Sequence, residues 1–235
     1  MRKTALALAL AATVLLLLTG GVWQVAFTVP AFDPAPLPER LLPLTAAEGH
    51  RLLTEGANSV DYAPLAAMFE AQRRPAFCGV ASSITILNAL RGDRRLSQRT
   101  FFEDWATELR VTFSGMTLDE LGALLRRHGA EAQVIHAEET TLEEFRIKAR
   151  ENLSRAHDYV LVNYQRATLG QREGGHISPL AAYSAATDRF LVLDVAAYRY
   201  PPVWVRAADL WNAINTHDSA SGRTRGMVLV ALGTR

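Results

Sequence analysis

The sequence predicts an α+β fold in which a helix that carries the only cysteine packs on an antiparallel sheet. Apolar residues at helical spacing follow Cys78 directly. Residues 177–183 and 189–195 are rich in strand-forming side chains and flank a short turn-prone stretch, which is typical of a β-hairpin. The 235 residues, 49% of them hydrophobic, fit one medium-sized domain with a substantial core.

The N-terminus has the pattern of an export segment. Met1-Arg2-Lys3 precedes an apolar stretch over residues 5–27, which is long enough to cross ~30 Å of hydrocarbon. We find no convincing small-x-small cleavage site after Leu18. We therefore predict that residues 1–28 form a signal anchor in the inner membrane, with the rest of the chain on the periplasmic side because basic residues stay in the cytoplasm. A cleaved signal that releases a soluble periplasmic protein is the alternative.

Residues 29–43 hold five of the ten prolines and are predicted to be an extended tether, so the folded domain is expected over residues 44–235. The net charge of +1 provides no field to attract nucleic acid, and no nucleic-acid partner is expected. A single cysteine excludes an intramolecular disulfide and any metal site built from several thiolates, and we assign no metal-ligating residues.

The remaining elements follow from periodicity and capping signals. Apolar spacing predicts a helix over 79–90, which ends at the following glycine. Residues 117–127 and 141–153 both begin with a threonine three residues before a glutamate, which is capping-box spacing, and they predict two further helices. Strands are expected at 159–164, 177–183, 189–195 and 226–232.

Three residues supply the parts of a cysteine nucleophile. At a helix start, Cys78 lies near unpaired backbone N–H groups and the positive end of the helix dipole, which favours the thiolate. His176 begins the predicted hairpin and Asp194 ends it. Pairing about a turn near Ala186 sets residue 194 opposite 178, so the imidazole and carboxylate are diagonal neighbours. The aspartate can then orient the imidazole, and the order along the chain is that of papain-like enzymes.

Each of these residues also has an ordinary structural interpretation. A lone cysteine is most often a small buried hydrophobe, and a lone histidine is most often a surface or hydrogen-bonded core residue. Asp194 can simply cap a strand end. Spacing alone leaves both interpretations open.

Longer motifs resemble the phytochelatin synthase family. The segment QRRPAFCGVASS around Cys78 looks like the nucleophile segment of that family, and the similarity continues to the C-terminus from about Leu44. The matching stretches are residues 72–83, 87–90, 115–121, 170–180, 188–195, 198–204 and 224–226. The resemblance implies a papain-like cysteine protease fold.

The resemblance also implies residue roles. Cys78 would be the nucleophile, His176 the general acid and base, and Asp194 the orienting carboxylate. Gln72 would donate its side-chain amide to the oxyanion beside the Cys78 backbone N–H. The substrate-binding candidates are Arg225 and Asp218 at the γ-glutamyl end, with Arg166 and Asn163 on the side of the second substrate. Each of these four could instead serve in a surface salt bridge or at a strand end.

The implied activity is that of a glutathione γ-glutamylcysteinyltransferase or hydrolase. The thiolate would cleave the Cys–Gly amide of glutathione, release glycine and leave a γ-Glu-Cys thioester. Water would then give γ-glutamylcysteine, whereas a second glutathione would give a phytochelatin, in thiol metabolism or heavy-metal detoxification. In that family, plant and yeast members carry a variable C-terminal region with many cysteines that is tied to metal-dependent activation, whereas the 235 residues here include one cysteine. We therefore expect no tightly bound cofactor, and Cd²⁺ or Zn²⁺ would act through metal–glutathione thiolates.

Two other functions fit the same residues. A cysteine peptidase acting on other peptides would show poor selectivity for γ-glutamyl substrates and would not need Arg225 or Asp218. A catalytically silent thiol- or metal-binding module would keep the fold without turnover, although the intact set around Cys78 argues against it. The sequence leaves a homodimer open.

Overall fold

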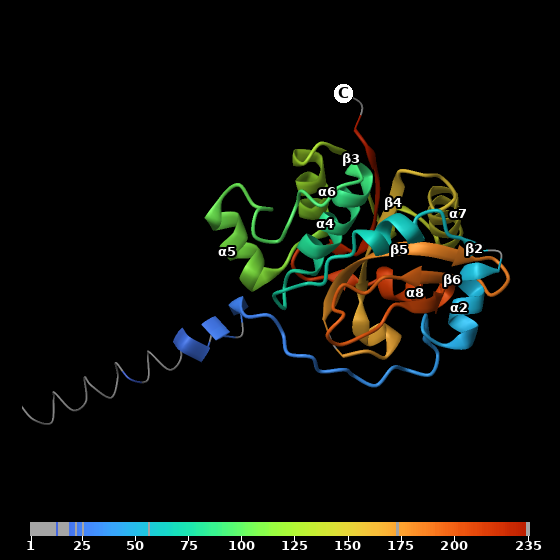
Figure 1. Cartoon of the computed structure of the whole chain (residues 1–235), viewed down its shortest axis with the longest axis horizontal. Helices are drawn as coiled ribbons and strands as arrows, with labels where there is room; N and C mark the ends of the chain where they lie inside the picture. The colour runs from blue at the N-terminus through green and yellow to red at the C-terminus, as the bar shows by residue number, and fades with distance from the viewer. Residues whose placement is uncertain are drawn as a thin grey trace, which may run out of the picture.

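A single antiparallel sheet forms the centre of the molecule (Figure 1). The structure is a computed structural model that describes residues 13, 19–21, 23–24, 26–55, 57–172 and 174–233. The sheet has eight strands in the order β1-β7-β6-β5-β4-β10-β3, and β2 also pairs with β5. These strands are β1 (Leu42–Pro43), β2 (Ala57–Asn58), β3 (Ala130–His136), β4 (Asp158–Gln165), β5 (Gly175–Ser184), β6 (Arg189–Val192), β7 (Val203–Arg206) and β10 (Gly226–Leu232). A separate small hairpin joins β8 (His217–Asp218) to β9 (Arg223–Thr224).

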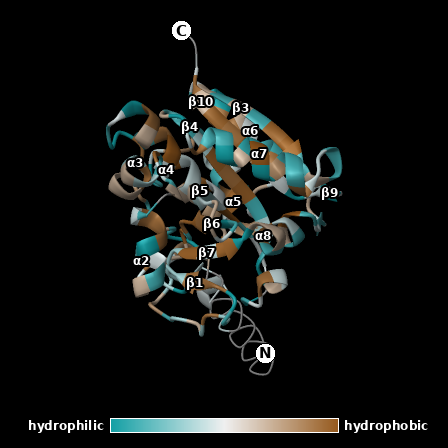
Figure 2. Ribbon diagram, turned by 90° about the vertical axis from the view of Figure 1, so that its right-hand side faces the viewer, coloured by the Kyte–Doolittle hydropathy of each residue, from teal (hydrophilic) through white to brown (hydrophobic). Residues whose placement is uncertain are grey.

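Helices cover both faces of the sheet, and the apolar core is therefore divided into two layers. The helices are α2 (Ala47–Thr54), α3 (Tyr62–Ala67), α4 (Cys78–Arg91), α5 (Trp105–Ser114), α6 (Leu118–Arg127), α7 (Leu142–Asn152) and α8 (Ala207–Ile214), with 3₁₀ turns η1 (Ala137–Glu139) and η2 (Arg166–Leu169). One core layer includes α4 and α6, and the other includes α7 and α8. Apolar residues follow the central strands between them (Figure 2). The predicted α+β class with an antiparallel sheet is confirmed.

Helix α4 is the most buried helix of the described chain, because every residue from Gly79 to Leu90 is buried. Its apolar side chains pack in the first core layer, and Ser82 Oγ donates a hydrogen bond to the Ile177 carbonyl of β5 at 2.9 Å. Gly92 ends the helix in the left-handed region at φ 71°, where glycine carries no steric cost. The helix predicted over 79–90 is confirmed with one residue more at each end.

The two predicted capping boxes are present. Glu120 N donates to Thr117 Oγ1 at 3.2 Å, and Thr117 N donates to Glu120 Oε2 at 2.9 Å. The same reciprocal pair links Thr141 and Glu144. Each cap stabilises the fold by about 1 kcal/mol, and together they fix where α6 and α7 begin.

The predicted hairpin is formed by β5 and β6, but β6 is shorter than expected. It ends at Val192 rather than Val195. A register shift between Leu180 and Ala182 introduces a bulge. Beyond this bulge, Leu193 N donates to the Pro179 carbonyl at 3.0 Å, so Asp194 follows the strand instead of ending it.

The proline-rich segment is extended but packs against the domain, which corrects its interpretation as a tether. Asp33 N and Ala35 N donate to the carbonyls of Tyr198 and Arg199 at 3.0 and 3.1 Å. The Asp33 carboxylate also pairs with Arg172 at 2.8 Å. Because β1 then joins β7, the packed part of the chain begins before residue 44.

Most of the predicted anchor lies outside the described residues, since residues 1–12, 14–18, 22 and 25 are not described. Within the described part of the chain, no helix has the length and apolar character needed to span a bilayer. The anchor therefore stays a prediction.

Candidate active site

A cleft of about 370 Å³ opens where the start of α4 meets β4, β5 and the β8–β9 hairpin. Five of the eight predicted site residues line it, and they come from segments far apart in the sequence. These residues are Cys78, Asn163, His176, Asp218 and Arg225.

Cys78 is the first residue of α4 and is half-buried at the cleft. Burial alone would raise the pKa of its thiol. The hydrogen bond with His176 and the positive charge of that ring outweigh burial, and the pKa is lowered. A Cβ on Gly79 would stand 3.2 Å from Ile177 Cδ1 and 3.4 Å from Met116 Sδ, so glycine keeps the space beside the nucleophile open.

His176 lies on β5, fully within the protein, with Tyr164 edge-on at 5.6 Å. Its Nε2 is 2.9 Å from Asp194 Oδ1. The attraction of this carboxylate for the charged ring helps to hold the imidazole in place. Nδ1 is then the ring nitrogen available to the thiol.

Two opposing influences set the pKa of His176. Burial and the nearby Arg166 guanidinium favour the neutral ring, but the Asp194 carboxylate and Cys78 favour the charged ring, and the pKa is raised. A lowered pKa for Cys78 and a raised pKa for His176 together favour a thiolate–imidazolium pair.

Asp194 is fully buried, and three nitrogen atoms lie close to its Oδ1. Besides His176, Arg166 Nη2 donates at 2.8 Å and Ala196 N donates at 2.8 Å. Burial would raise the pKa of this carboxyl, but the positive charges of His176 and Arg166 hold it well below its ordinary value. Asp194 therefore stays ionised behind the imidazole.

The structure does not place Arg166 on the substrate side, which corrects that prediction. Its side chain is buried, Nη1 donates to Gln171 Oε1 at 3.0 Å, and the guanidinium lies 4.9 Å from the Tyr200 ring centre. Arg166 thus binds Asp194 and does not line the cleft. Sequence reasoning did not identify Gln171 and Tyr200. Gln171 is only five residues from the arginine, but no sequence pattern marks its side chain as a partner, and the fold alone brings Tyr200 to the guanidinium.

Gln72 is buried beside the turn that leads into α4. Its backbone N donates to the Val195 carbonyl at 2.9 Å, which ties this turn to the segment after Asp194. Its Nε2 donates to the carbonyls of Pro75 and Arg74 at 3.1 and 3.3 Å. The amide N–H groups are therefore engaged by the turn, and donation to an oxyanion requires that the amide rotate.

The opposite wall of the cleft carries one cation and one anion. Arg225 Nη1 donates to the His217 carbonyl at 2.6 Å, and Nη2 lies 3.9 Å from Asp218 Oδ1. Arg225 Nε is buried, and no oxygen of the described residues accepts a hydrogen bond from it. A Cβ on Gly175 would meet Nη2 at 3.1 Å, so the glycine makes room for the guanidinium. This pairing suits a ligand end with both an amine and a carboxylate.

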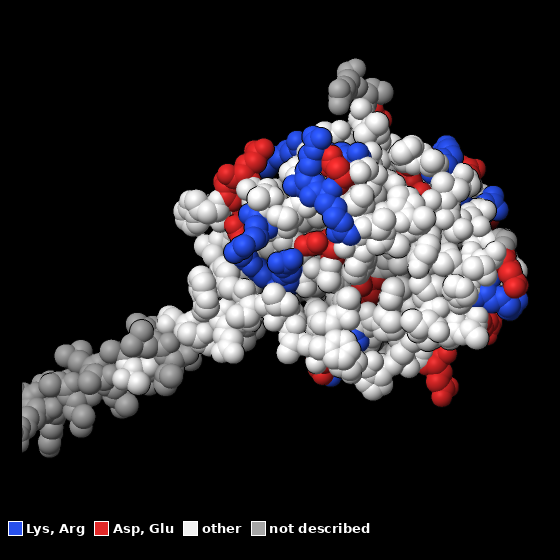
Figure 3. Space-filling model, viewed as in Figure 1, with Lys and Arg blue, Asp and Glu red and all other residues white. Residues whose placement is uncertain are grey.

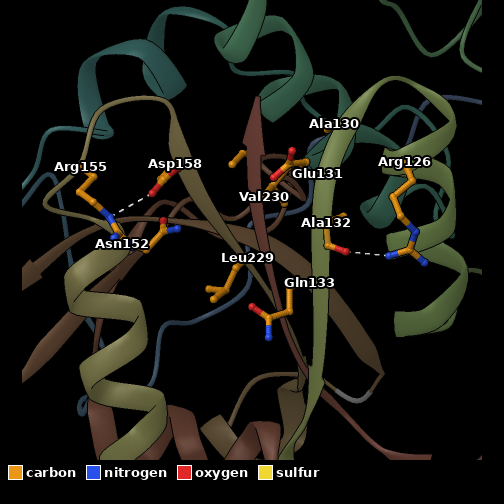
Figure 4. Close-up of a pocket in the computed structure, with 11 residues that line it drawn as sticks. Arg126, Ala130, Glu131, Ala132, Gln133, Asn152, Arg155, Asp158, Leu229 and Val230 are labelled. Carbon is orange, nitrogen blue, oxygen red and sulfur yellow. Dashed lines mark hydrogen bonds and ion pairs between the residues drawn. The ribbon is translucent and has the colours of Figure 1, made fainter. Parts of the chain in front are cut away.

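A larger hollow of about 490 Å³ lies elsewhere, between α7 and the edge strand β3 (Figure 4). Gln133, Leu229 and Asn152 face it, and Arg155 pairs with Asp158 at its rim at 3.0 Å. It contains no cysteine or histidine among its lining residues, so its volume alone does not make it the reactive site. Across the described residues, no group of three or more His, Cys, Asp and Glu side chains is arranged to hold a metal ion.

Comparison with known proteins agrees with this geometry. The family model for phytochelatin synthase matches residues 32–227. A glutathione γ-glutamylcysteinyltransferase 1 of Triticum aestivum is 34% identical over 216 residues, which is 85% of this chain and 43% of the relative. The corresponding enzyme 3 of Lotus japonicus is 31% identical (84% and 45%), and that of Schizosaccharomyces pombe is 28% identical (85% and 51%). The chain thus spans about half the length of the curated relatives it matches.

Proposed function

Because this chain belongs to the phytochelatin synthase family, we propose that it is a thiol acyltransferase that uses glutathione as its acyl donor. The observation that carries this proposal is the contiguous set of Cys78, His176 and Asp194 facing the Arg225–Asp218 pair across one cleft. The set supplies a nucleophile, a proton carrier and a place for the γ-glutamyl end.

In the first half of the reaction, the Cys78 thiolate attacks the carbonyl carbon of the Cys–Gly amide. The resulting oxyanion lies near the N–H groups at the start of α4, which favour negative charge. His176 gives its proton to the departing glycine nitrogen, and the C–N bond breaks. A γ-Glu-Cys thioester remains on Cys78, while Asp194 stabilises the charged ring before the transfer.

In the second half, neutral His176 accepts a proton from the incoming nucleophile. Water yields γ-glutamylcysteine, and the amine of a second glutathione yields the elongated product. Asn163, which lines the cleft from β4, is the remaining candidate for the acceptor side. Occupancy of that side by glutathione decides how much thioester is lost to water.

The arrangement also supports a papain-like relationship for the fold. A cysteine at the start of a buried helix faces a histidine and an aspartate on an antiparallel sheet, in the same order along the chain as in papain-like enzymes. Cd²⁺ or Zn²⁺ would enter as metal thiolates of glutathione, as part of the substrate. Residues 5–27 would keep the enzyme on the periplasmic side of the inner membrane.

Mass spectrometry of glutathione incubated with the protein, with and without Cd²⁺, tests the proposal. We expect glycine release that is abolished by Cys78→Ala and retained by Ser83→Ala, a buried control on the same helix. The ratio of γ-glutamylcysteine to elongated product separates hydrolysis from transfer. Absence of Cys78-dependent glycine release in both conditions would refute the glutathione reaction. Undiminished activity of Arg225→Ala on unrelated peptides would favour the general peptidase.

A further inference from the structure

Helix α5 exposes a stripe of large apolar side chains. Trp105, Leu109 and Phe113 are 76%, 39% and 56% exposed, and their spacing of four residues places them on one helix face. Val111 on the opposite face packs inward, and Thr112, which neighbours the stripe, is buried as well. A contiguous exposed apolar surface of this kind marks an interaction site in a soluble domain. We call these three residues the α5 stripe.

The stripe is continuous with the end of the apolar N-terminal segment. Phe27 packs edge-on against Phe113 at 5.8 Å, and Trp23 stacks on Phe27 at 4.3 Å. In the sequence, these two aromatic residues close the apolar stretch that begins at Ala5. Figure 1 shows the described part of this segment reaching the domain beside α5. The chain therefore arrives from its apolar leader at the face that carries the stripe.

Basic side chains border this face. Arg110 is exposed next to Leu109, and Arg127 is exposed on the neighbouring helix α6. Figure 3 shows Lys and Arg over the region of α5 and α6, with Asp and Glu between and beside them. Acidic groups lie on this face as well. Glu120 pairs with Arg110 at 2.9 Å and Glu108 pairs with Arg74 at 2.8 Å, and Asp104 is exposed beside Trp105, so charges of both signs border the stripe.

We propose that the α5 stripe, together with Phe27, docks on a phospholipid bilayer. An amphipathic helix with aromatic residues on its apolar face lies in the membrane interface. Tryptophan is enriched at this depth, which suits the position of Trp105. A bilayer is favoured over a second copy of the chain because the apolar leader reaches the domain at this same face, and its insertion would hold α5 against the lipid.

Docking would place the membrane close to the reactive cleft. The end of α5 and the following residues, Phe113 to Met116, form one wall of the cleft. Arg74 connects the two regions, because its guanidinium lies 4.9 Å from the Phe27 ring and 4.6 Å from the ring of Phe77, the residue before Cys78. Arg74 Nη1 also donates to Thr112 Oγ1 of α5 at 2.9 Å.

The test uses the full chain and exploits its single cysteine. In a Cys78→Ser background, Leu109→Cys is labelled with an environment-sensitive NBD fluorophore and reconstituted with vesicles of phosphatidylcholine and phosphatidylglycerol. Val60→Cys is the matched control, because Val60 is an exposed apolar residue, 47% exposed, that follows β2 at the end of the molecule away from α5 (Figure 1). Both labelled proteins carry the same N-terminal segment, so anchoring by that segment is held constant.

We expect the label at residue 109 to shift to shorter wavelength and to become protected from aqueous iodide, while the label at residue 60 stays accessible. An unshifted label at 109, or an equal shift at 60, would overturn the proposal. A second measurement avoids labelling altogether. Vesicles of brominated phosphatidylcholine should quench Trp105, read as the difference between the unmodified chain and Trp105→Phe. An unquenched difference signal would also overturn it. Neither readout depends on turnover, so failure of the glutathione reaction leaves this test intact.

Discussion

Replacing Arg166 by methionine should both destabilise the protein and shift the titration of its nucleophile. The guanidinium donates to Asp194 at 2.8 Å and to Gln171 at 3.0 Å, with both carboxylate and arginine buried. Methionine fills a similar volume but leaves Asp194 with one fewer positive partner. Breaking a buried pair by removing one partner costs about 3–5 kcal/mol. For a domain of this size, we expect the melting temperature to fall by about 10 °C.

The effect on the nucleophile has a definite sign. The charge of Arg166 lowers the pKa of Cys78 and also lowers the pKa of His176. Without that charge, both pKa values rise. The acid limb of the rate profile, where the thiolate forms, should therefore move to higher pH, and so should the alkaline limb, where the imidazolium loses its proton.

Alkylation by iodoacetamide measures this titration directly, because Cys78 is the only cysteine in the chain. The alkylation rate constant should begin to rise at a higher pH in Arg166→Met than in the unmodified protein. Arg166→Lys is the matched control, since it keeps the charge but cannot hold Asp194 and Gln171 together. It should restore most of the alkylation profile and only part of the stability. An unchanged profile in Arg166→Met, with stability lost, would show that the arginine has a structural role only.

Three further predictions concern the substrate wall, a buried carboxyl and a close backbone contact. Arg225→Lys should raise KM for glutathione with little change in kcat, because a lysine cannot reproduce the hydrogen bonds to Thr216 and His217. If kcat fell by the same factor as kcat/KM, the arginine would not act in ground-state binding. Asp61 is buried with both carboxylate oxygens unpartnered in the described chain, and burial raises its pKa to about 8. The stability that protonated Asp61 contributes is fully present below the pKa of an unfolded aspartate and is lost as pH rises through about 8. In urea titrations, Asp61→Asn should therefore be more stable than the unmodified protein at about pH 9 but not at about pH 4. Gly226→Ala should lower the urea midpoint, because the added Cβ would stand 2.1 Å from the Ile135 carbonyl oxygen, and an unchanged midpoint would show that the strands can separate at low cost.

Local sequence signals predicted the elements whose ends are fixed by local chemistry. The threonine caps set where α6 and α7 begin, and Gly92 sets where α4 ends. Strand β10 covers Gly226–Leu232 as predicted. In each case, the residues that decide the boundary lie within a few positions of it. Short elements such as α8, which spans eight residues, carry too few periodic positions to be recognised in this way.

Features that depend on distant contacts could not be predicted. Arg166 follows a buried strand, where a substrate role is a reasonable interpretation, and only the fold turns its side chain toward Asp194. The proline-rich residues have the composition of a free linker, yet Asp33 finds Arg172 and the carbonyl of Tyr198 on the domain surface. The partners of these residues are separated from them by 28 positions for Arg166 and Asp194 and by 139 positions for Asp33 and Arg172, and no local pattern encodes such a contact.

The contact between His176 and Asp194 shows how a correct prediction can rest on an incomplete cause. Near the turn, Ser184 pairs with Arg189, and a regular ladder continued from there would set residue 194 opposite 179. Residues directly opposite each other share a face of the sheet, and 179 lies on the face opposite that of His176. A regular hairpin would therefore have separated the imidazole from the carboxylate.

The bulge between Leu180 and Ala182 removes this conflict. It shifts the pairing by one residue, so that Leu180 lies opposite Val192. Continued from that pair, residue 194 lies opposite 178, on the same face as His176, and the two side chains meet at 2.9 Å. A turn assumed to centre at Ala186 gives the same offset without the bulge, which is why the sequence predicted the contact. The extra residue at the bulge, rather than the turn, is what brings the acid to the base.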